Sequence, residues 1–125
     1  MALIAIIDDD PDIIDASSII LKSKGHTIIS ASNPDDGYKL VTKEKPDLII
    51  LDVMMDEPDD GFYLAQKFRK EGITTPILMY TSVSKATGLE FEKSEMVPVE
   101  DFVEKPISPE ELIQKVEKLL KKEGN

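Results

Sequence analysis

The sequence predicts an α/β domain built on five parallel strands, with helices on both faces of the sheet. Short runs rich in Ile, Val and Leu recur along the 125 residues. These runs are apolar at almost every position instead of alternating, which is typical of strands covered on both sides. Stretches with helical periodicity separate them. Because strand–helix–strand crossovers are right-handed, the alternation predicts a parallel sheet between two helical layers.

The strands are expected at the five most apolar runs, which are Leu3–Ile7, Thr27–Ala31, Leu48–Leu51, Ile77–Tyr80 and Val99–Val103. Three helix starts are marked by an N-cap residue followed by proline, at Asp10-Pro11, Asn33-Pro34 and Ser108-Pro109. Two more helices are expected near Phe62–Lys70 and Lys85–Ser94. The chain is long enough for one hydrophobic core, so residues 1–125 are predicted to form a single domain.

Composition narrows the classes of function. The formal net charge is −10, which argues against direct binding to nucleic acid, because phosphate backbones attract basic surfaces. The absence of cysteine excludes disulfides, thiol catalysis and cysteine-ligated zinc. No membrane span and no signal peptide are recognisable. We therefore expect a cytoplasmic protein whose acids face metal cations or a basic patch on another protein.

Charged and hydroxyl side chains follow four of the five predicted strands. Asp8 and Asp9 follow the first strand, and Asp52 follows the third. Thr81 follows the fourth strand, and Lys105 follows the fifth. Because the carboxyl ends of parallel strands share one edge of the sheet, where ligands bind, these side chains are predicted to form one site.

The three carboxylates indicate a cation site. Two carboxylates about 4 Å apart repel by roughly 4 kcal/mol at an effective dielectric of 20, so a third is unfavourable unless a cation or a proton intervenes. Oxygen ligands in a small open site suit Mg²⁺, for which Mn²⁺ can substitute. A metal, an ammonium and a hydroxyl around Asp52 are the groups needed to transfer a phosphoryl group onto that carboxylate. Asp10, which directly follows Asp8 and Asp9, is instead predicted to cap the first helix.

Four stretches of the sequence resemble the receiver domain of two-component response regulators, of the chemotaxis-regulator type. They are, in chain order, "IIDDDPD", "PDLIILDVMMDEPDDG", "PILMYTS" and "DFVEKP". The resemblance covers nearly the whole chain and implies a flavodoxin-like fold with strand order 2-1-3-4-5. It also implies a signalling switch and not a turnover enzyme. A sensor histidine kinase or a phosphotransfer protein would phosphorylate it, and a downstream protein or an attached output domain would respond.

The resemblance also implies a role for each acid. Asp52 matches the phosphorylated aspartate of the family. Asp9 and Asp52 match the direct Mg²⁺ ligands, while Asp8 acts through a water molecule. The backbone carbonyl of Met54 completes the protein ligands.

The remaining site residues follow from the same resemblance. Thr81 and Lys105 match the residues that hold the phosphoryl group. Thr81 and Phe102 match the switch pair, in which the aromatic ring moves when the hydroxyl is drawn inward. Met54 and Val83 match the positions that tune attack of water on the acyl phosphate. Neither side chain can position water by hydrogen bonding, so slow self-dephosphorylation is expected.

Competing interpretations use some of the same residues. The serious rival is a pseudo-receiver that is not phosphorylated and acts only as a docking module. A haloacid dehalogenase-type phosphatase is disfavoured because Asp12 stands where its signature has threonine. An EF-hand loop fails because Ile13 and Ile19 replace the required glycine and glutamate. The single histidine, His26, is expected to be exposed and inert.

The loop after Asp52 departs from the family pattern. It is one residue longer than usual and carries the four further acids Asp56, Glu57, Asp59 and Asp60. Either these acids form a solvated loop that leads into the next helix, or they raise cation affinity and restrain access of anionic phosphodonors.

Overall fold

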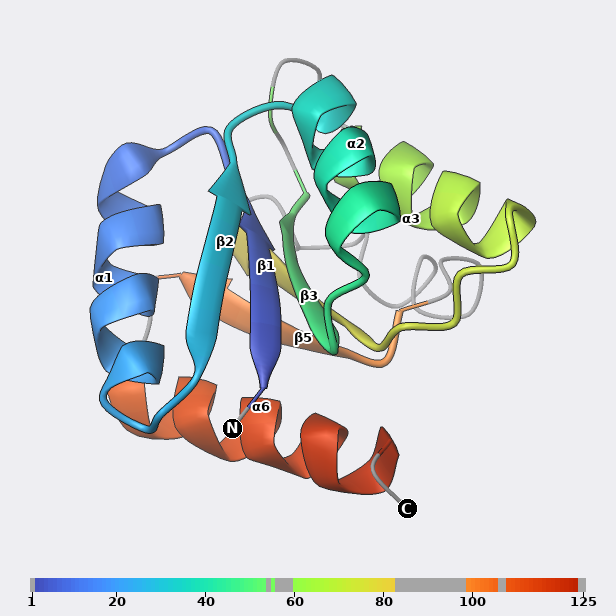
Figure 1. The fold of residues 1–125 in the computed structure, drawn as a ribbon. Coiled ribbons are helices and arrows are strands. Elements are labelled where there is room, and N and C mark those ends of the chain that lie inside the picture. Colours follow the sequence, from blue (N-terminus) through green and yellow to red (C-terminus); the bar gives the residue numbers. More distant parts are fainter. Residues whose placement is uncertain (1, 54, 56–59, 83–98, 106–107, 124–125) are drawn as a thin grey trace.

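The computed structural model describes residues 2–53, 55, 60–82, 99–105 and 108–123, with the backbone alone for 81–82, 104–105 and 122–123. Its centre is a five-stranded parallel sheet of order β2-β1-β3-β4-β5 (Figure 1). The strands are β1 (Leu3–Ile7), β2 (Thr27–Ala31), β3 (Leu48–Asp52), β4 (Ile77–Ser82) and β5 (Asp101–Lys105). The predicted flavodoxin-like fold and strand order are confirmed.

Helices cover both faces of the sheet. The described helices are α1 (Pro11–Lys22), α2 (Pro34–Glu44), α3 (Asp60–Lys70) and α6 (Pro109–Glu123). Figure 1 shows α1 and α6 on one side of the sheet and α2 and α3 on the other. This two-layer cover explains why the strands are apolar at successive positions.

Side-chain caps begin the helices where the sequence predicts them. The Asp10 carboxylate accepts a hydrogen bond of 2.9 Å from the Asp12 amide at the start of α1. The Asn33 side chain accepts one of 2.8 Å from the Asp36 amide at the start of α2. At α6 the Ser108 hydroxyl lies 3.4 Å from the amide three residues later, a longer version of the same cap. Local chemistry therefore sets these three helix starts.

The start of β5 differs from the prediction. The apolar run suggests a strand from Val99, but β5 begins at Asp101. The reason lies in Glu100, whose carboxylate accepts a hydrogen bond of 2.7 Å from the Ile77 amide. This side chain takes the amide that would otherwise bond to the backbone of the fifth strand, so the regular ladder starts at Asp101, two residues after Val99.

The other element bounds agree with the prediction to within two residues. β3 extends to Asp52 and β4 to Ser82, and α3 begins at Asp60, two residues before the predicted Phe62. The acids Asp56, Glu57 and Asp59 lie outside the described residues, as does the predicted helix over residues 85–94.

The core is divided by the sheet into two apolar clusters. Along β1, Ile4 and Ile6 belong to the cluster beneath α1 and α6, whereas Ala5 and Ile7 belong to the cluster beneath α2 and α3. All four side chains are fully buried. Alternation of side chains along a strand therefore supplies both clusters at once. Packing on both faces thus anchors the strands, whose parallel pairing brings their carboxyl ends to the same edge of the sheet.

His26 is not the exposed residue that its turn position suggests. It is half-buried, and its Nδ1 atom accepts a hydrogen bond of 3.1 Å from the Ala2 amide. Its Nε2 atom is buried with no hydrogen-bond partner in the described structure. Burial therefore lowers the pKa of His26 from its ordinary value of 6.5.

Among the described residues, no helix is long and apolar enough to cross a membrane.

Candidate acidic metal site

The three predicted acids meet at the carboxyl edge of the sheet. β1 and β3 are neighbours, with Ile7 opposite Leu51, so Asp8 and Asp52 leave the sheet side by side. One carboxylate oxygen from each of Asp8, Asp9 and Asp52 lies within 4.8 Å of the others. The topology thus brings together residues that are more than forty positions apart in the sequence.

The three carboxylates differ in their access to water. Asp8 is fully buried, Asp52 is 4% exposed and Asp9 is exposed. Two buried carboxylates beside an exposed one form a site that is open to solvent on one side. Their mutual repulsion, about 4 kcal/mol per close pair at an effective dielectric of 20, favours a cation among them.

The donor set fits a hard divalent cation. All three side chains offer carboxylate oxygens, and no cysteine occurs in the chain. Oxygens bound directly to one Mg²⁺ lie at most about 4.2 Å apart, since each metal–oxygen bond is about 2.1 Å long. Carboxylate oxygens that lie within 4.8 Å of one another can therefore share one such cation, either directly or through its bound waters.

Backbone amides hold the turn after β1. The Asp8 amide donates to the Ala31 carbonyl at 3.1 Å, which continues the pairing of β1 with β2. One oxygen of the Asp8 carboxylate accepts from the Asp10 amide at 2.9 Å. Asp10 itself caps α1. The run of three aspartates is thus divided as predicted, since Asp8 and Asp9 join the cluster and Asp10 starts the helix.

A buried polar pair lies near the acids and was not predicted from the sequence. The Tyr80 hydroxyl lies 2.7 Å from the Ser17 hydroxyl, and both residues are buried. Burial raises the pKa of Tyr80 well above its usual range, and the negative charge of Asp8 adds to the rise. The electrostatic influence of Asp8 thus reaches the interior under the site. The sequence signal is a tyrosine and a serine at otherwise apolar core positions.

Gly61 is a second residue that sequence reasoning missed. Its amide donates to the Val53 carbonyl at 2.8 Å. A Cβ atom at this position would lie 2.1 Å from the Asp52 carbonyl oxygen and 2.7 Å from Val53 Cα. Only glycine allows α3 to begin so close to the backbone that carries Asp52. The signal is a lone glycine in the first turn of the helix that follows the acidic loop.

The other predicted site residues are only partly described. Thr81 pairs with Glu104 across β4 and β5, so the ends of both strands reach the same edge as Asp52. The backbone alone is described for Thr81 and Lys105, whereas Met54 and Val83 lie outside the described residues.

Phe102, the predicted switch aromatic, is partly buried against the cluster beneath α2 and α3. It lies on β5 opposite Met79 of β4. The strand that carries it also carries Lys105 at its carboxyl end. The backbone therefore links the aromatic ring to the edge where the acids meet.

The fold and the acidic edge define a class of protein. The family model for the response regulator receiver domain matches residues 4–117. The chain belongs to this family, the receiver domains of two-component response regulators. Members act as signalling switches and not as classical enzymes, and they bind Mg²⁺ at an acidic pocket. Membership implies a phosphodonor such as a histidine kinase.

Named relatives fall into two sizes. The alkaline phosphatase synthesis transcriptional regulatory protein PhoP of Bacillus subtilis is 32% identical over 95% of this chain and 48% of its own length. The protein PilH of Pseudomonas aeruginosa is 29% identical over 96% of this chain and 98% of its own length. The chain thus spans about half of some curated relatives and nearly all of another.

Solved structures agree in fold. The chemotaxis protein CheY4 of Vibrio cholerae superposes with a TM-score of 0.85 at 26% identity, covering 95% of this chain and 98% of that one. The receiver domain of NtrX from Brucella abortus gives 0.82 at 26% identity, covering 94% and 98%. Both neighbours are similar to this chain over their full receiver folds.

Proposed function

We propose that the chain is a phosphorylated receiver, in which Asp52 accepts a phosphoryl group from a histidine kinase or a phosphotransfer protein. The observation that carries this proposal is the meeting of Asp8 and Asp9 with Asp52 at the carboxyl edge of the sheet. In the step, the phosphorus–nitrogen bond of the donor phosphohistidine breaks and a bond to an Asp52 carboxylate oxygen forms. The histidine leaves as the free imidazole.

Asp9 and Asp52 would hold Mg²⁺ directly, with Asp8 through water and the Met54 carbonyl as a further ligand. Bound there, the cation would neutralise the phosphoryl oxygens in the transition state. Asp52 is 4% exposed, so its carboxylate enters the reaction with little competing water. Thr81 and Lys105 would hold the transferred group from β4 and β5.

The switch would run through β4 and β5. Phosphorylation would draw the Thr81 hydroxyl toward the new group, and the Phe102 ring would move with it. Support comes from the half-buried position of Phe102 on the strand that ends at Lys105. We place this switch in the cytoplasm, acting on a partner protein or an attached output domain and not on nucleic acid directly.

The test is addition of mass to the intact protein. Incubation with Mg²⁺ and phosphoramidate or acetyl phosphate should add one phosphoryl group, and Mn²⁺ should replace Mg²⁺. Asp52→Asn should prevent the addition, while the matched variant Asp47→Asn, at the opposite edge of the sheet, should leave it intact. Absence of an adduct with both donors and both metals would overturn the proposal in favour of the unphosphorylated docking module.

Decay of the adduct tests the lifetime prediction. The adduct should decay slowly, and Met54→Asn or Val83→Glu should shorten its half-life by giving water a hydrogen-bond partner. An unchanged half-life in both variants would refute the role assigned to these two positions.

A further inference from the structure

The amino end of β5 is held on both faces of the sheet by two adjacent acids. Glu100, just before the strand, bonds to Arg69 of α3, and Asp101, its first residue, bonds to Lys115 of α6. These two helices cover opposite faces of the sheet (Figure 1). Successive residues of an extended chain point to opposite faces, so one acid serves each side.

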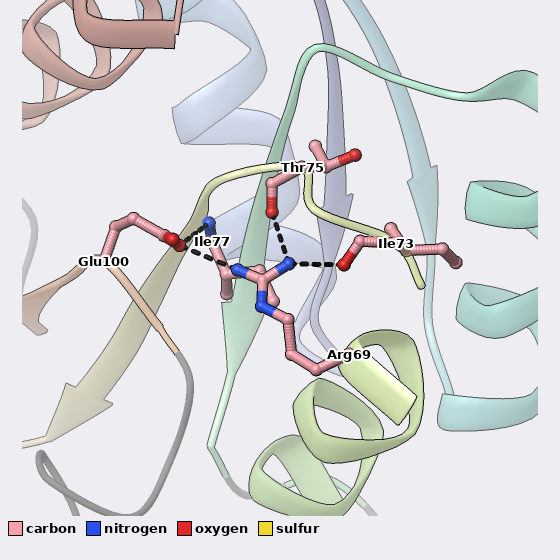
Figure 2. Close-up of polar contacts among 5 residues, drawn as sticks. All are labelled: Arg69, Ile73, Thr75, Ile77 and Glu100. Carbon is pink, nitrogen blue, oxygen red and sulfur yellow. Dashed lines mark hydrogen bonds and ion pairs between the residues drawn. The ribbon is translucent and has the colours of Figure 1, made fainter. Parts of the chain in front are cut away.

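Arg69 is the centre of the network on the α3 side (Figure 2). Its Nη1 atom donates to the carbonyls of Ile73 and Thr75, each at 2.8 Å. Its Nη2 atom donates to Glu100 Oε1 at 2.8 Å. The same Oε1 atom accepts from the Ile77 amide at 2.7 Å, and the Glu100 amide donates to the Ile77 carbonyl at 3.0 Å. One guanidinium thus joins α3, the loop before β4 and the start of β5.

The α6 side has a simpler pair. Lys115 Nζ lies 3.1 Å from Asp101 Oδ2, while Asp101 Oδ1 accepts from the Phe102 amide at 2.8 Å. The four paired side chains are only 19–35% exposed. Glu100 is an exposed residue, but its Oε1 atom accepts from two donors at once, and this geometry is more directional than a lone surface ion pair.

β5 needs such fixation because it is a short edge strand. Among the described strands it is the last in the sheet, next to β4, and it has five residues. A slip of one residue would turn every side chain of the strand to the other face. Phe102 would then leave its apolar cluster, and Lys105 would leave its place at the carboxyl edge. The two acids oppose such a slip because each would face the wrong helix.

We propose that Arg69, Glu100, Asp101 and Lys115 are positioning residues that fix the register of β5 and thereby place Lys105 for the phosphoryl group. The catalytic half of this inference rests on the proposed phosphorylation of Asp52, whereas the register half stands on the contacts alone. The Mg²⁺ ligands lie on and after other strands, β1 and β3, so the network should affect phosphoryl transfer without affecting metal binding.

The decisive variant is Arg69→Gln, with Lys70→Gln as its control. Lys70 is the next residue of α3, carries the same charge and is exposed. Arg69→Gln should lower the rate constant of phosphorylation by phosphoramidate about tenfold or more, since misplacement by about 1 Å costs up to a hundredfold. Its Mg²⁺ dissociation constant, measured by calorimetry, should stay within about twofold of the wild-type value. Lys70→Gln should change neither.

Amide spectroscopy tests the register directly and does not depend on phosphorylation. In Arg69→Gln the Ile77 amide should exchange faster with solvent, and the amide resonances of Phe102 and Lys105 should shift. Arg69→Lys keeps the charge but not the forked geometry, so it should give intermediate values and covers the case in which the glutamine variant fails to fold.

Three outcomes would overturn the inference. The first is an unchanged phosphorylation rate beside faster Ile77 exchange, which would make the network purely structural. The second is an equal loss of rate in Lys70→Gln, which would make the effect one of net charge on an anionic donor. The third is unshifted Phe102 and Lys105 resonances. If the wild-type protein takes no phosphoryl group, the proposed function fails, yet the amide data still decide whether the network sets the register.

Discussion

Acidic residues lie at both ends of the strands, but they are clustered at the carboxyl edge and paired with backbone amides at the amino edge. At the carboxyl edge, oxygens of Asp8, Asp9 and Asp52 lie within 4.8 Å of one another. At the amino edge, Asp47 and Glu100 stand just before β3 and β5 and bond to the neighbouring strand. The carboxylate of each accepts from the first amide of that strand, at 2.9 Å and 2.7 Å, and its own amide donates back to the carbonyl of the same residue.

This contrast separates acids that stabilise the fold from acids that serve a ligand. The amino-edge acids satisfy amides at the start of a strand, much as an N-cap satisfies amides at the start of a helix. The carboxyl-edge acids repel one another, and this repulsion lowers the stability of the fold when no cation is bound. Local rules of stability are commonly broken at functional sites and followed elsewhere.

The largest effect on stability is expected from Gly61→Ala. Gly61 is where the start of α3 packs against the backbone at the carboxyl edge. The new methyl group would lie 2.1 Å from the Asp52 carbonyl oxygen, so α3 must move. We expect a loss of about 3 kcal/mol in the free energy of unfolding, measured in urea, together with weaker Mg²⁺ binding. Gln66→Ala, exposed on the same helix, should lose nothing. Equal stability of the two variants would show that Gly61 is not needed for this approach.

A smaller effect of opposite sign tests the contrast itself. Asp8→Asn keeps an oxygen for the Asp10 amide but removes one crowded charge. Without Mg²⁺ it should raise the free energy of unfolding by about 1 kcal/mol, and it should also weaken Mg²⁺ binding. Asp101→Asn, at the amino edge, should instead lower stability by about 0.5 kcal/mol by weakening its pair with Lys115. Destabilisation by both changes would refute the division between the edges.

The smallest effect concerns His26, at the amino edge. Its burial lowers its pKa below 6.5, so the unfolded chain binds a proton before the folded chain does. Its contribution to stability is therefore complete above pH 6.5 and is lost as the pH falls toward the folded-state value. Proton NMR can read this titration without assignment, because the chain has one histidine. A midpoint at or above 6.5 would contradict the burial.

Sequence patterns predict the parts of the structure that depend on nearby residues. The caps at Asp10 and Asn33 and the apolar runs of the strands depend on local spacing, and the structure confirms them. The strand order came from the family resemblance. The meeting of Asp8 with Asp52 could also be foreseen, because parallel topology brings strand ends together.

What the sequence could not predict depends on contacts between distant residues. The late start of β5 arises from Glu100 and Ile77, which are separated by 23 positions. His26 bonds to the amide of Ala2, 24 positions away, and is half-buried there. Gly61 is needed because the backbone of Asp52 and Val53, on the other side of the acidic loop, lies against it. Composition and periodicity contain no signal for such distances, so only the folded chain reveals these contacts.

The close approach at Gly61 has a consequence for the length of α3. This helix begins against the backbone of Asp52 and, within eleven residues, presents Arg69 to Glu100 near the opposite edge. One inserted residue would rotate everything after it by about 100° and lengthen the helix by about 1.5 Å, so one of the two attachments would break. The helix is thus a spacer of fixed length. The helix should accommodate substitutions on its outer side, as at the exposed Tyr63, but not insertions or deletions within it.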